Sequence, residues 1–456
     1  ETGAAELHWQ GTVTAGDNHV EISLPPEKML SNGDYFCNAR IALDGHGEDW
    51  GTAMRTIRGP NALLRLNLDR YSHRGKHPEV HGEVEILGKG DLQLQLRDSY
   101  GRVLAHELRQ GVSGRQSFKL IPEKEYFLPL ADMVATLTVD GTLVDQRQNS
   151  LTLEPPERQP LNFVVWTHGS NAWFNRDSNR TISDMGFTVA TGGSTNIESA
   201  AMSRAQAEEA MRTGLRFAPM SMHRISLWGN QLQGVVRDPC LRDPAYWRKM
   251  SDDVKSIVEK VSGSFPFTYY SGDENSLGHY DAAHEFCQSE HCLAAFRGEM
   301  KRKYGDLTTL NRLWRRQYST WEEIRPLTFS EARSEQNIAP WVEHRIFMMR
   351  AVSDALGKMK KELLRFDPEA RLGFSGQLNT NLHGAFNWQA ALQYVDYPTA
   401  YLRGSDGLLD LARSFLPQGG SCGAWIGYGV PLPEIRWNYW RQIVNGWFSP
   451  SYWWSG

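Results

Sequence analysis

The sequence predicts an α/β protein: a (β/α)8 TIM barrel preceded by an all-β region. Three features of the sequence predict this fold class. Short alternating strands occupy the first third of the chain, a proline-rich segment follows them, and apolar strands then alternate with helical stretches. The chain has 456 residues, 40% of them hydrophobic, which suffices for a barrel and a smaller module with a core in each.

The first part of the chain, residues 1–155, is predicted to be a β-sandwich region of one or two small modules. Alternating runs recur, such as residues 20–24 (VEISL) and 92–96 (LQLQL), and turn sequences such as SNGD at 31–34 separate them. The polar, proline-rich segment EPPERQP at 154–160 is typical of a hinge between domains.

The second part, residues 156–456, is predicted to be the barrel. Its expected strands span 162–167, 187–191, 216–220, 267–271, 372–375, 394–401, 421–426 and 446–454. Its expected helices span 244–261, 283–304, 307–317, 341–365, 405–415 and 434–444. Eight strand-helix steps favour a barrel over an open nucleotide-binding sheet, and no glycine-rich phosphate-binding motif follows a strand.

Charge and hydropathy exclude several kinds of partner. The net charge is −4, which gives no electrostatic basis for binding nucleic acid, and no apolar run approaches the roughly 18 residues that span a bilayer. The start, Glu1-Thr2-Gly3, resembles a scar left by cleavage of a secretion leader, and Asn179-Arg180-Thr181 matches a glycosylation acceptor. A secreted, periplasmic or extracellular location is therefore expected, with homo-oligomerisation left open.

Functional side chains in a barrel gather where its strands end and its loops begin. Those positions carry a polar and aromatic set suited to a neutral, polyhydroxylated ligand. The predicted substrate-binding residues are Trp166, His168, His223, Arg224, Asn275, Gln377, Tyr401, Arg403, Trp425, Tyr428 and Trp454. Each histidine could instead be a loop residue with hydrogen-bond partners inside the protein. The two arginines could instead balance the charge of nearby carboxylates, and each aromatic residue could instead pack in the core.

Two adjacent carboxylates, Asp273 and Glu274, follow the fourth predicted strand. Neighbouring strand residues face opposite ways, so we expect at most one of them to point into the pocket. Burial beside a like charge would raise one pKa, as a general acid requires. The alternative is a carboxylate that pairs with a neighbouring arginine or caps the next helix.

The stretch 272–314 resembles the family 42 β-galactosidases of the retaining barrel glycosidase clan. The motifs that carry the resemblance are DEN at 273–275, CQSEHC at 287–292, AFR at 295–297, KYG at 303–305 and LNRLW at 310–314. Residues 437–454 also resemble the last helix and strand of that family. The resemblance implies a carbohydrate substrate and an acid/base role for Glu274, with Asp273 at a position where the family has Asn.

The sequence departs from that family in two ways. The resemblance implies a nucleophilic Glu at the end of strand seven, but SCGAWIGY at 421–428 contains no acid. Asp406, in the loop after strand six, is therefore the first candidate for a second catalytic carboxylate, and Asp273 is the other. The zinc cluster that the resemblance implies is also incomplete, since two cysteines, Cys287 and Cys292, remain in that stretch. No zinc and no cofactor are therefore expected.

These observations leave three functional hypotheses. The first is a glycoside hydrolase that uses Glu274 as acid/base with Asp273 or Asp406 as its partner. The second is a carbohydrate-binding barrel without catalysis, which the missing strand-seven acid suggests. The third is a metal-dependent barrel hydrolase, which lacks a convergent set of histidines and acids.

Overall fold

A computed structural model describes residues 33–43, 47–57, 59–75, 77–155, 161–166, 175–192, 200–227, 234–279, 283–376, 382–401, 406–427 and 429–453. The chain forms two compact units, Glu1–Pro156 and Glu157–Gly456, so the division falls within the proline-rich segment.

The described part of the first unit is β-structure, with antiparallel pairing except between strands β4 and β8, which pair in parallel. Strands β1 (Gly33–Leu43) and β2 (Gly47–Ile57) pair with each other. A six-stranded sheet contains β3 (Ala62–Leu68), β4 (Ser72–His73), β5 (Val80–Asp98), β6 (Val103–Leu120), β7 (Leu130–Val139) and β8 (Thr142–Leu153). The all-β character predicted from the alternating runs is thus present in the described residues, while the β-sandwich remains a prediction.

Strand β5 organises this sheet. Its side chains alternate between buried and partly exposed positions, and the alternation breaks at residues 87–89, where the register with β6 shifts. The segment before the break pairs with β3, and the segment after it pairs with β7. Both segments contribute to one hydrophobic core, which includes Val84, Ile86, Leu92 and Leu94.

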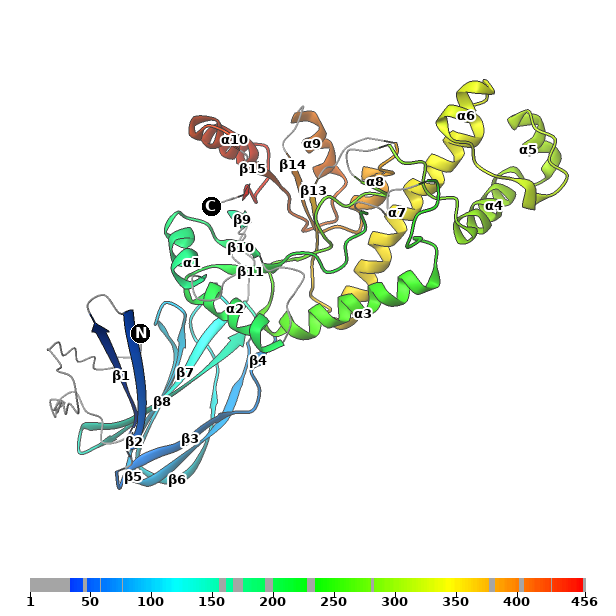
Figure 1. The fold of residues 1–456 in the computed structure, drawn as a ribbon. Coiled ribbons are helices and arrows are strands. Elements are labelled where there is room, and N and C mark those ends of the chain that lie inside the picture. The colour runs from blue at the N-terminus through cyan, green and yellow to red at the C-terminus, as the bar shows by residue number, and fades with distance from the viewer. Residues whose placement is uncertain are drawn as a thin grey trace. The chain divides into compact units, whose positions relative to one another are not determined.

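The second unit is a nearly closed barrel of eight parallel strands (Figure 1). The strands are β9 (Val164–Trp166), β10 (Val189–Gly192), β11 (Arg216–Pro219), β12 (Tyr269–Tyr270), β13 (Leu372–Gly376), β14 (Tyr397–Tyr401), β15 (Gly423–Gly427) and β16 (Ser451–Trp453). Each lies within or overlaps a predicted strand.

The barrel is completed between β11 and β12 by single backbone hydrogen bonds rather than by a continuous ladder. The amide of Phe267 donates to the carbonyl of Phe217 at 2.8 Å. Beyond the strand ends, the amides of Met222 and His223 donate to the carbonyls of Tyr270 and Ser271 at 2.8 and 3.0 Å. The loop after strand three is thereby fixed beside the end of strand four.

The helices follow the strands in barrel order. They are α1 (Asn175–Asp184), α2 (Ala200–Arg212), α3 (Pro244–Val261), α4 (Glu290–Tyr304), α5 (Leu307–Trp314), α6 (Phe329–Ser334), α7 (Ala339–Phe366), α8 (Trp388–Leu392), α9 (Asp406–Ser414) and α10 (Leu432–Val444). The four helices α4 to α7 form an excursion between β12 and β13, from which α7 runs back along the barrel (Figure 1). Among the described helices, none combines the length and apolar character needed to cross a bilayer.

Local sequence explains where two of these helices begin. Asp243 caps α3 by accepting a hydrogen bond from the amide of Ala245, and Pro244 occupies the first turn. The helix predicted for 283–304 begins later, at Glu290, because the Ser289 side chain caps it by accepting from the amide of Cys292. Residues 283–289 are therefore loop, which corrects the prediction.

Aromatic side chains fill the interior of the barrel. Phe267, Tyr270, Tyr397 and Trp425 are buried there together with smaller apolar residues. The Tyr270 hydroxyl lies 3.0 Å from that of Thr399, which satisfies both polar groups inside the core. The barrel is thus a packed core, and its polar groups gather at the carboxyl ends of the strands.

Candidate active site

The segment after strand four is held against strand five by its backbone. The amide of Glu274 donates to the carbonyl of Ser375 at 3.0 Å. Glu274 has a φ of 49°, and the facing Gly376 has a φ of 116°. A Cβ on Gly376 would lie 2.5 Å from the Glu274 nitrogen, so glycine is required for this approach. Because the backbone of Glu274 is in the left-handed conformation, the side chains of Asp273 and Glu274 do not follow the in-out alternation of a regular strand.

Asp273 faces strands five and six. Its Oδ1 accepts hydrogen bonds from the Ser375 hydroxyl at 2.9 Å and from the Tyr401 hydroxyl at 3.2 Å. The indole N–H of Trp425 can only donate, and it lies 2.9 Å from the Ser375 oxygen. The single hydrogen of Ser375 is therefore directed at Asp273. Trp425 orients this contact although it does not touch the carboxylate.

Burial raises the pKa of Asp273 above its ordinary value, because the charged form loses hydration. Hydrogen bonds from Ser375 and Tyr401 and the charge of Arg224 oppose that rise without cancelling it. A carboxyl group whose pKa is raised in this way can hold a proton closer to neutral pH than an exposed aspartate can.

Glu274 lies beside the arginine predicted for this site. The Arg224 Nη2 is 3.8 Å from Glu274 Oε2, and its Nε donates to the Ser226 hydroxyl at 2.8 Å. The side chains of Arg224 and Glu274 are 34% and 16% exposed, so a ligand in the barrel mouth could reach both. Asp273 and Glu274 also favour the charged form of Arg224, which burial disfavours. The structure thus brings Arg224, Asp273, Glu274 and Tyr401 together.

The predicted aromatic residues at strands one and seven also lie together. The rings of Trp166 and Trp425 are 5.6 Å apart. Trp425 is only 2% exposed, so it serves the core and the Ser375 contact. This position corrects its predicted role as a sugar-stacking residue, because a buried ring offers no face to a ligand.

His223 and Asn275 each have hydrogen-bond partners within the protein, and their contact with substrate stays a prediction. Nδ1 of His223 lies 2.7 Å from Asp253 of α3, and burial lowers the His223 pKa. Asn275 is 1% exposed; its Oδ1 accepts from the amide of Ile225 at 2.7 Å, and its Nδ2 donates to the carbonyl of Gly272 at 2.9 Å. Asn275 thus joins the loops after strands three and four.

Several predicted residues lie outside the described part of the chain. These are His168, Gln377, Arg403, Tyr428 and Trp454. Asp406 begins α9, but its side chain is not among those described. Its predicted role as the second carboxylate therefore remains a prediction.

Sequence reasoning missed Ser375 and Gly376. Both lie at the end of strand five, and the alternation of strand residues could have placed Ser375 on the inward face. The need for glycine at 376 arises from its contact with Glu274 across two strands, for which the local sequence has no signal.

A second cluster of reactive side chains lies in the loops after strands three and four. The thiols of Cys240, Cys287 and Cys292 are buried, free of disulfides and within 4.8 Å of one another. Hydrogen bonds from Cys240 and Cys292 lower the pKa of Cys287, whereas that of Cys292 is raised. No zinc was expected because the stretch 272–314 holds two cysteines, but Cys240 lies beside them as a third, from the loop before α3. This thiol cluster has the chemistry of a site for a soft cation such as zinc.

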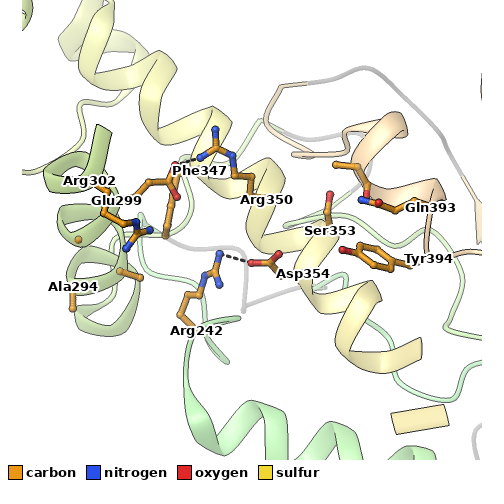
Figure 2. Close-up of a pocket in the computed structure, with 13 residues that line it drawn as sticks. Arg242, Ala294, Glu299, Arg302, Phe347, Arg350, Ser353, Asp354, Gln393 and Tyr394 are labelled. Atoms are coloured by element: carbon orange, nitrogen blue, oxygen red, sulfur yellow. Dashed lines mark hydrogen bonds and ion pairs between the residues drawn. The ribbon is translucent and has the colours of Figure 1, made fainter. Parts of the chain in front are cut away.

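A polar pocket of about 480 Å³ lies among α4, α7 and α8 (Figure 2). Arg242 pairs with Asp354 at 2.9 Å, and Arg350 pairs with Glu299 (Figure 2). Its lining comes from these helices and from the loop before α3, whereas the predicted site residues come from strand ends. The pocket is therefore separate in composition from the carboxylate site.

Comparisons with known proteins agree with this architecture. The family model described as Glyco_hydro_42, β-galactosidase, matches residues 230–407. The solved β-galactosidase from Rahnella sp. R3 is 12% identical, with a TM-score of 0.51, over 65% of this chain and 51% of that one. The β-galactosidase from the psychrophilic Marinomonas ef1 is 14% identical, with a TM-score of 0.50, over 64% of this chain and 54% of that one.

This chain thus spans about half the length of these two β-galactosidases. No relative was found among curated protein sequences. At such identities the solved structures establish the shared barrel fold, and the family match covers the segment with Asp273 and Glu274. The resemblance predicted from the sequence is confirmed: residues 230–407, less than half of the chain, match the model of that β-galactosidase family.

Proposed function

We propose that the barrel hydrolyses a glycosidic bond in an oligosaccharide or polysaccharide, with Glu274 as the acid/base. The observation that carries this proposal is the position of Glu274. It follows strand four within the family-matched segment, it is partly exposed at the barrel mouth, and it lies beside Arg224. A general acid at that position would protonate the glycosidic oxygen as the bond breaks, and the resulting base would activate water.

Asp273 directly precedes Glu274, and its fixed orientation also supports the proposal. Its oxygens are held by Ser375 and Tyr401, which fixes its orientation before a substrate binds. The proposal gives it the task of stabilising positive charge at the sugar carbon. Asp406 is the alternative for that task. A separation of about 5–5.5 Å between the two reacting carboxylates would favour retention, and about 6.5–9.5 Å would favour inversion.

The test is turnover on a panel of glycans and aryl glycosides, with Glu274→Gln as the matched variant. Glutamine keeps the size and the hydrogen-bonding oxygen but cannot transfer the proton. We expect loss of about 10²–10⁴ in kcat with an unchanged circular dichroism spectrum. Full activity of the variant on a glycan that the wild type cleaves would contradict the role of Glu274.

A carbohydrate-binding barrel without catalysis is the second candidate. One observation favours it: strand β15, Gly423–Gly427, carries no carboxylate. Under this proposal, the protein would bind a glycan on an array and release no product during prolonged incubation. Release of a reducing sugar that depends on Glu274 would exclude it.

A further inference from the structure

The polar pocket among α4, α7 and α8 has room for a small molecule. Its volume of about 480 Å³ lies within the range of about 300–1,000 Å³ that is typical of small-molecule sites. Small residues make this room, namely Ala294, Ala295, Gly298 and Ala390. A Cβ added to Gly298 would meet only Nη1 of Arg302, at 3.9 Å, so this face of α4 borders open space. None of these residues belongs to the carboxylate site.

The charges that line the pocket do not balance. Two of its three arginines have carboxylate partners: Arg242 pairs with Asp354 at 2.9 Å, and Arg350 pairs with Glu299 (Figure 2). The third, Arg302 of α4, makes no hydrogen bond or ion pair within the part of the chain that the structure describes. The pocket therefore carries one positive charge more than its own carboxylates offset.

This arrangement favours an anion as the ligand. A cation would have to displace Arg242 or Arg350 from its carboxylate, whereas an anion would meet Arg302 with its N–H donors unused. Nη1 of Arg350 donates to Glu299, and the Arg350 side chain is 53% exposed, so its other N–H groups are within reach of a ligand. Guanidinium groups bind carboxylates and tetrahedral oxyanions through paired hydrogen bonds. The pocket thus suits a ligand that carries a carboxylate or a sulfate group.

The wall opposite α4 supplies groups that suit the hydroxyls of a ligand. The Tyr394 ring lies against α7, since a Cβ on Gly357 would be 3.0–3.2 Å from three of its atoms. The Tyr394 hydroxyl has no partner among the described residues, and Figure 2 shows it directed toward the other lining residues. The amide nitrogen of Gln393 donates to the Ala390 carbonyl at 2.9 Å, which leaves the amide oxygen as an acceptor. A hydroxyl and an amide oxygen can both bind sugar hydroxyls.

We infer that this pocket binds an anionic sugar unit, a uronate or a sulfated sugar. Its acidic group would lie at Arg302 and Arg350, and its hydroxyls would lie at Gln393 and Tyr394. The choice of an anion comes from the charges of the pocket, whereas the choice of a sugar rests on the proposed function. The glycan would be held at residues other than those of the carboxylate site. Because partly exposed charges are screened by ions, its binding should depend on salt.

The experiment measures binding to the full chain by isothermal titration calorimetry with four probes. These are a uronic acid disaccharide, a sulfated disaccharide, a neutral disaccharide and inorganic sulfate. At least one anionic disaccharide should bind about tenfold more tightly than the neutral one, and its affinity should fall when salt is raised from about 50 to about 500 mM. The two anionic disaccharides distinguish a carboxylate from a sulfate as the acidic group.

Three outcomes would overturn the inference. The first is no binding of either anionic disaccharide, and the second is equal affinity for the neutral disaccharide. The third is inorganic sulfate bound as tightly as the better anionic disaccharide, which would show a site for a free anion and no recognition of a sugar.

Variants locate the ligand. Arg302→Gln should weaken binding of the anionic disaccharide by about fivefold, because an exposed charged contact is lost. Arg312→Gln, on α5 and outside the pocket, is the matched control and should bind as the wild type does. Gly298→Leu should weaken binding by filling the open space, and leucine suits a helix better than glycine does. Unchanged affinity in Arg302→Gln and Gly298→Leu, or an equal loss in Arg224→Gln, would place the ligand elsewhere and overturn the inference.

These measurements require no turnover, so their failure differs from failure of the proposed hydrolysis. A chain that binds the anionic disaccharide in this pocket but cleaves no glycan would support the inference and contradict the proposed hydrolysis. A chain that cleaves a neutral glycan and binds neither anionic disaccharide would do the reverse.

Discussion

The carboxylate site and the thiol cluster lie on the same two barrel connections, yet their side chains differ in exposure to solvent. Glu274 and Arg224 remain partly exposed at the barrel mouth. Cys240, Cys287 and Cys292 are buried within a few ångströms of one another. An exposed acid can exchange protons with a substrate, whereas enclosed thiols can bind a small ion. The difference indicates that one loop region can hold reactive carboxylates next to the strand ends and a buried thiol cluster further along the chain.

The largest stability effect should come from the thiol cluster. If zinc is present at about 1,000 times its Kd, binding stabilises the fold by about 4 kcal/mol, which Cys240→Ser would remove. Thermal unfolding with and without chelator measures this. Chelation should lower the Tm of the wild type and leave that of Cys240→Ser unchanged. A chelator effect of equal size in both proteins would place the stabilising ion elsewhere.

A smaller loss of stability should follow Gly376→Ala at the carboxylate site. The new Cβ would lie 2.6 Å from the Glu274 Cα, at a φ of 116°. We expect a cost of about 1–3 kcal/mol in denaturant unfolding, together with reduced turnover. Gly419→Ala is the matched control: its φ is 76°, but its Cβ would meet nothing within 4 Å. Equal costs for both variants would indicate that only the backbone angle matters.

Strand β14 carries two tyrosines, of which Tyr401 contacts the carboxylate site and Tyr397 lies in the barrel core. The Tyr401 hydroxyl contacts Asp273 at 3.2 Å, whereas the Tyr397 hydroxyl lies 3.3 Å from the Ser449 carbonyl. Tyr401→Phe should lower kcat by between about twofold and tenfold, which corresponds to about 0.5–1.5 kcal/mol for one hydrogen bond. It should also raise the pKa of Asp273 further, because a donor to the carboxylate is lost. Tyr397→Phe should change stability but not the pH profile of kcat. An equal shift of the pH profile in the two variants would contradict the role of the Tyr401 contact with Asp273.

The smallest effect is a gain in stability from Asp273→Asn. The folded state raises the Asp273 pKa above 3.8, so ionisation opposes folding at neutral pH. Asparagine keeps an acceptor for Ser375 and Tyr401 without that charge. The variant should therefore be more stable than the wild type at neutral pH, and the gain should shrink as the pH falls through the raised pKa of folded Asp273 and be lost below about 3.8. Urea unfolding across this range measures it; a gain that grows in acid would have the wrong sign.

Local patterns in the sequence predicted most of the barrel. Apolar strands of the right length and a capped helix such as α3, whose buried side chains recur at helical spacing, are encoded within short windows. The carboxylates were found because they directly follow a strand. In contrast, Ser375 and Cys240 act through contacts between distant segments, which residue spacing along the chain does not encode. The predicted start of α4 was wrong, although Ser289 is of a residue type that commonly caps a helix.

The proton transfer assigned to Glu274 is tested most directly by its dependence on the leaving group. The measurement is kcat/KM for wild type and Glu274→Gln on a series of glycosides of one sugar, with leaving groups from acidic phenols to alcohols. Acidic phenols depart without a proton, so the variant should lose little on them and about 10²–10⁴ on the alcohols. An equal loss across the whole series would contradict the role of Glu274 as the acid that protonates the departing oxygen.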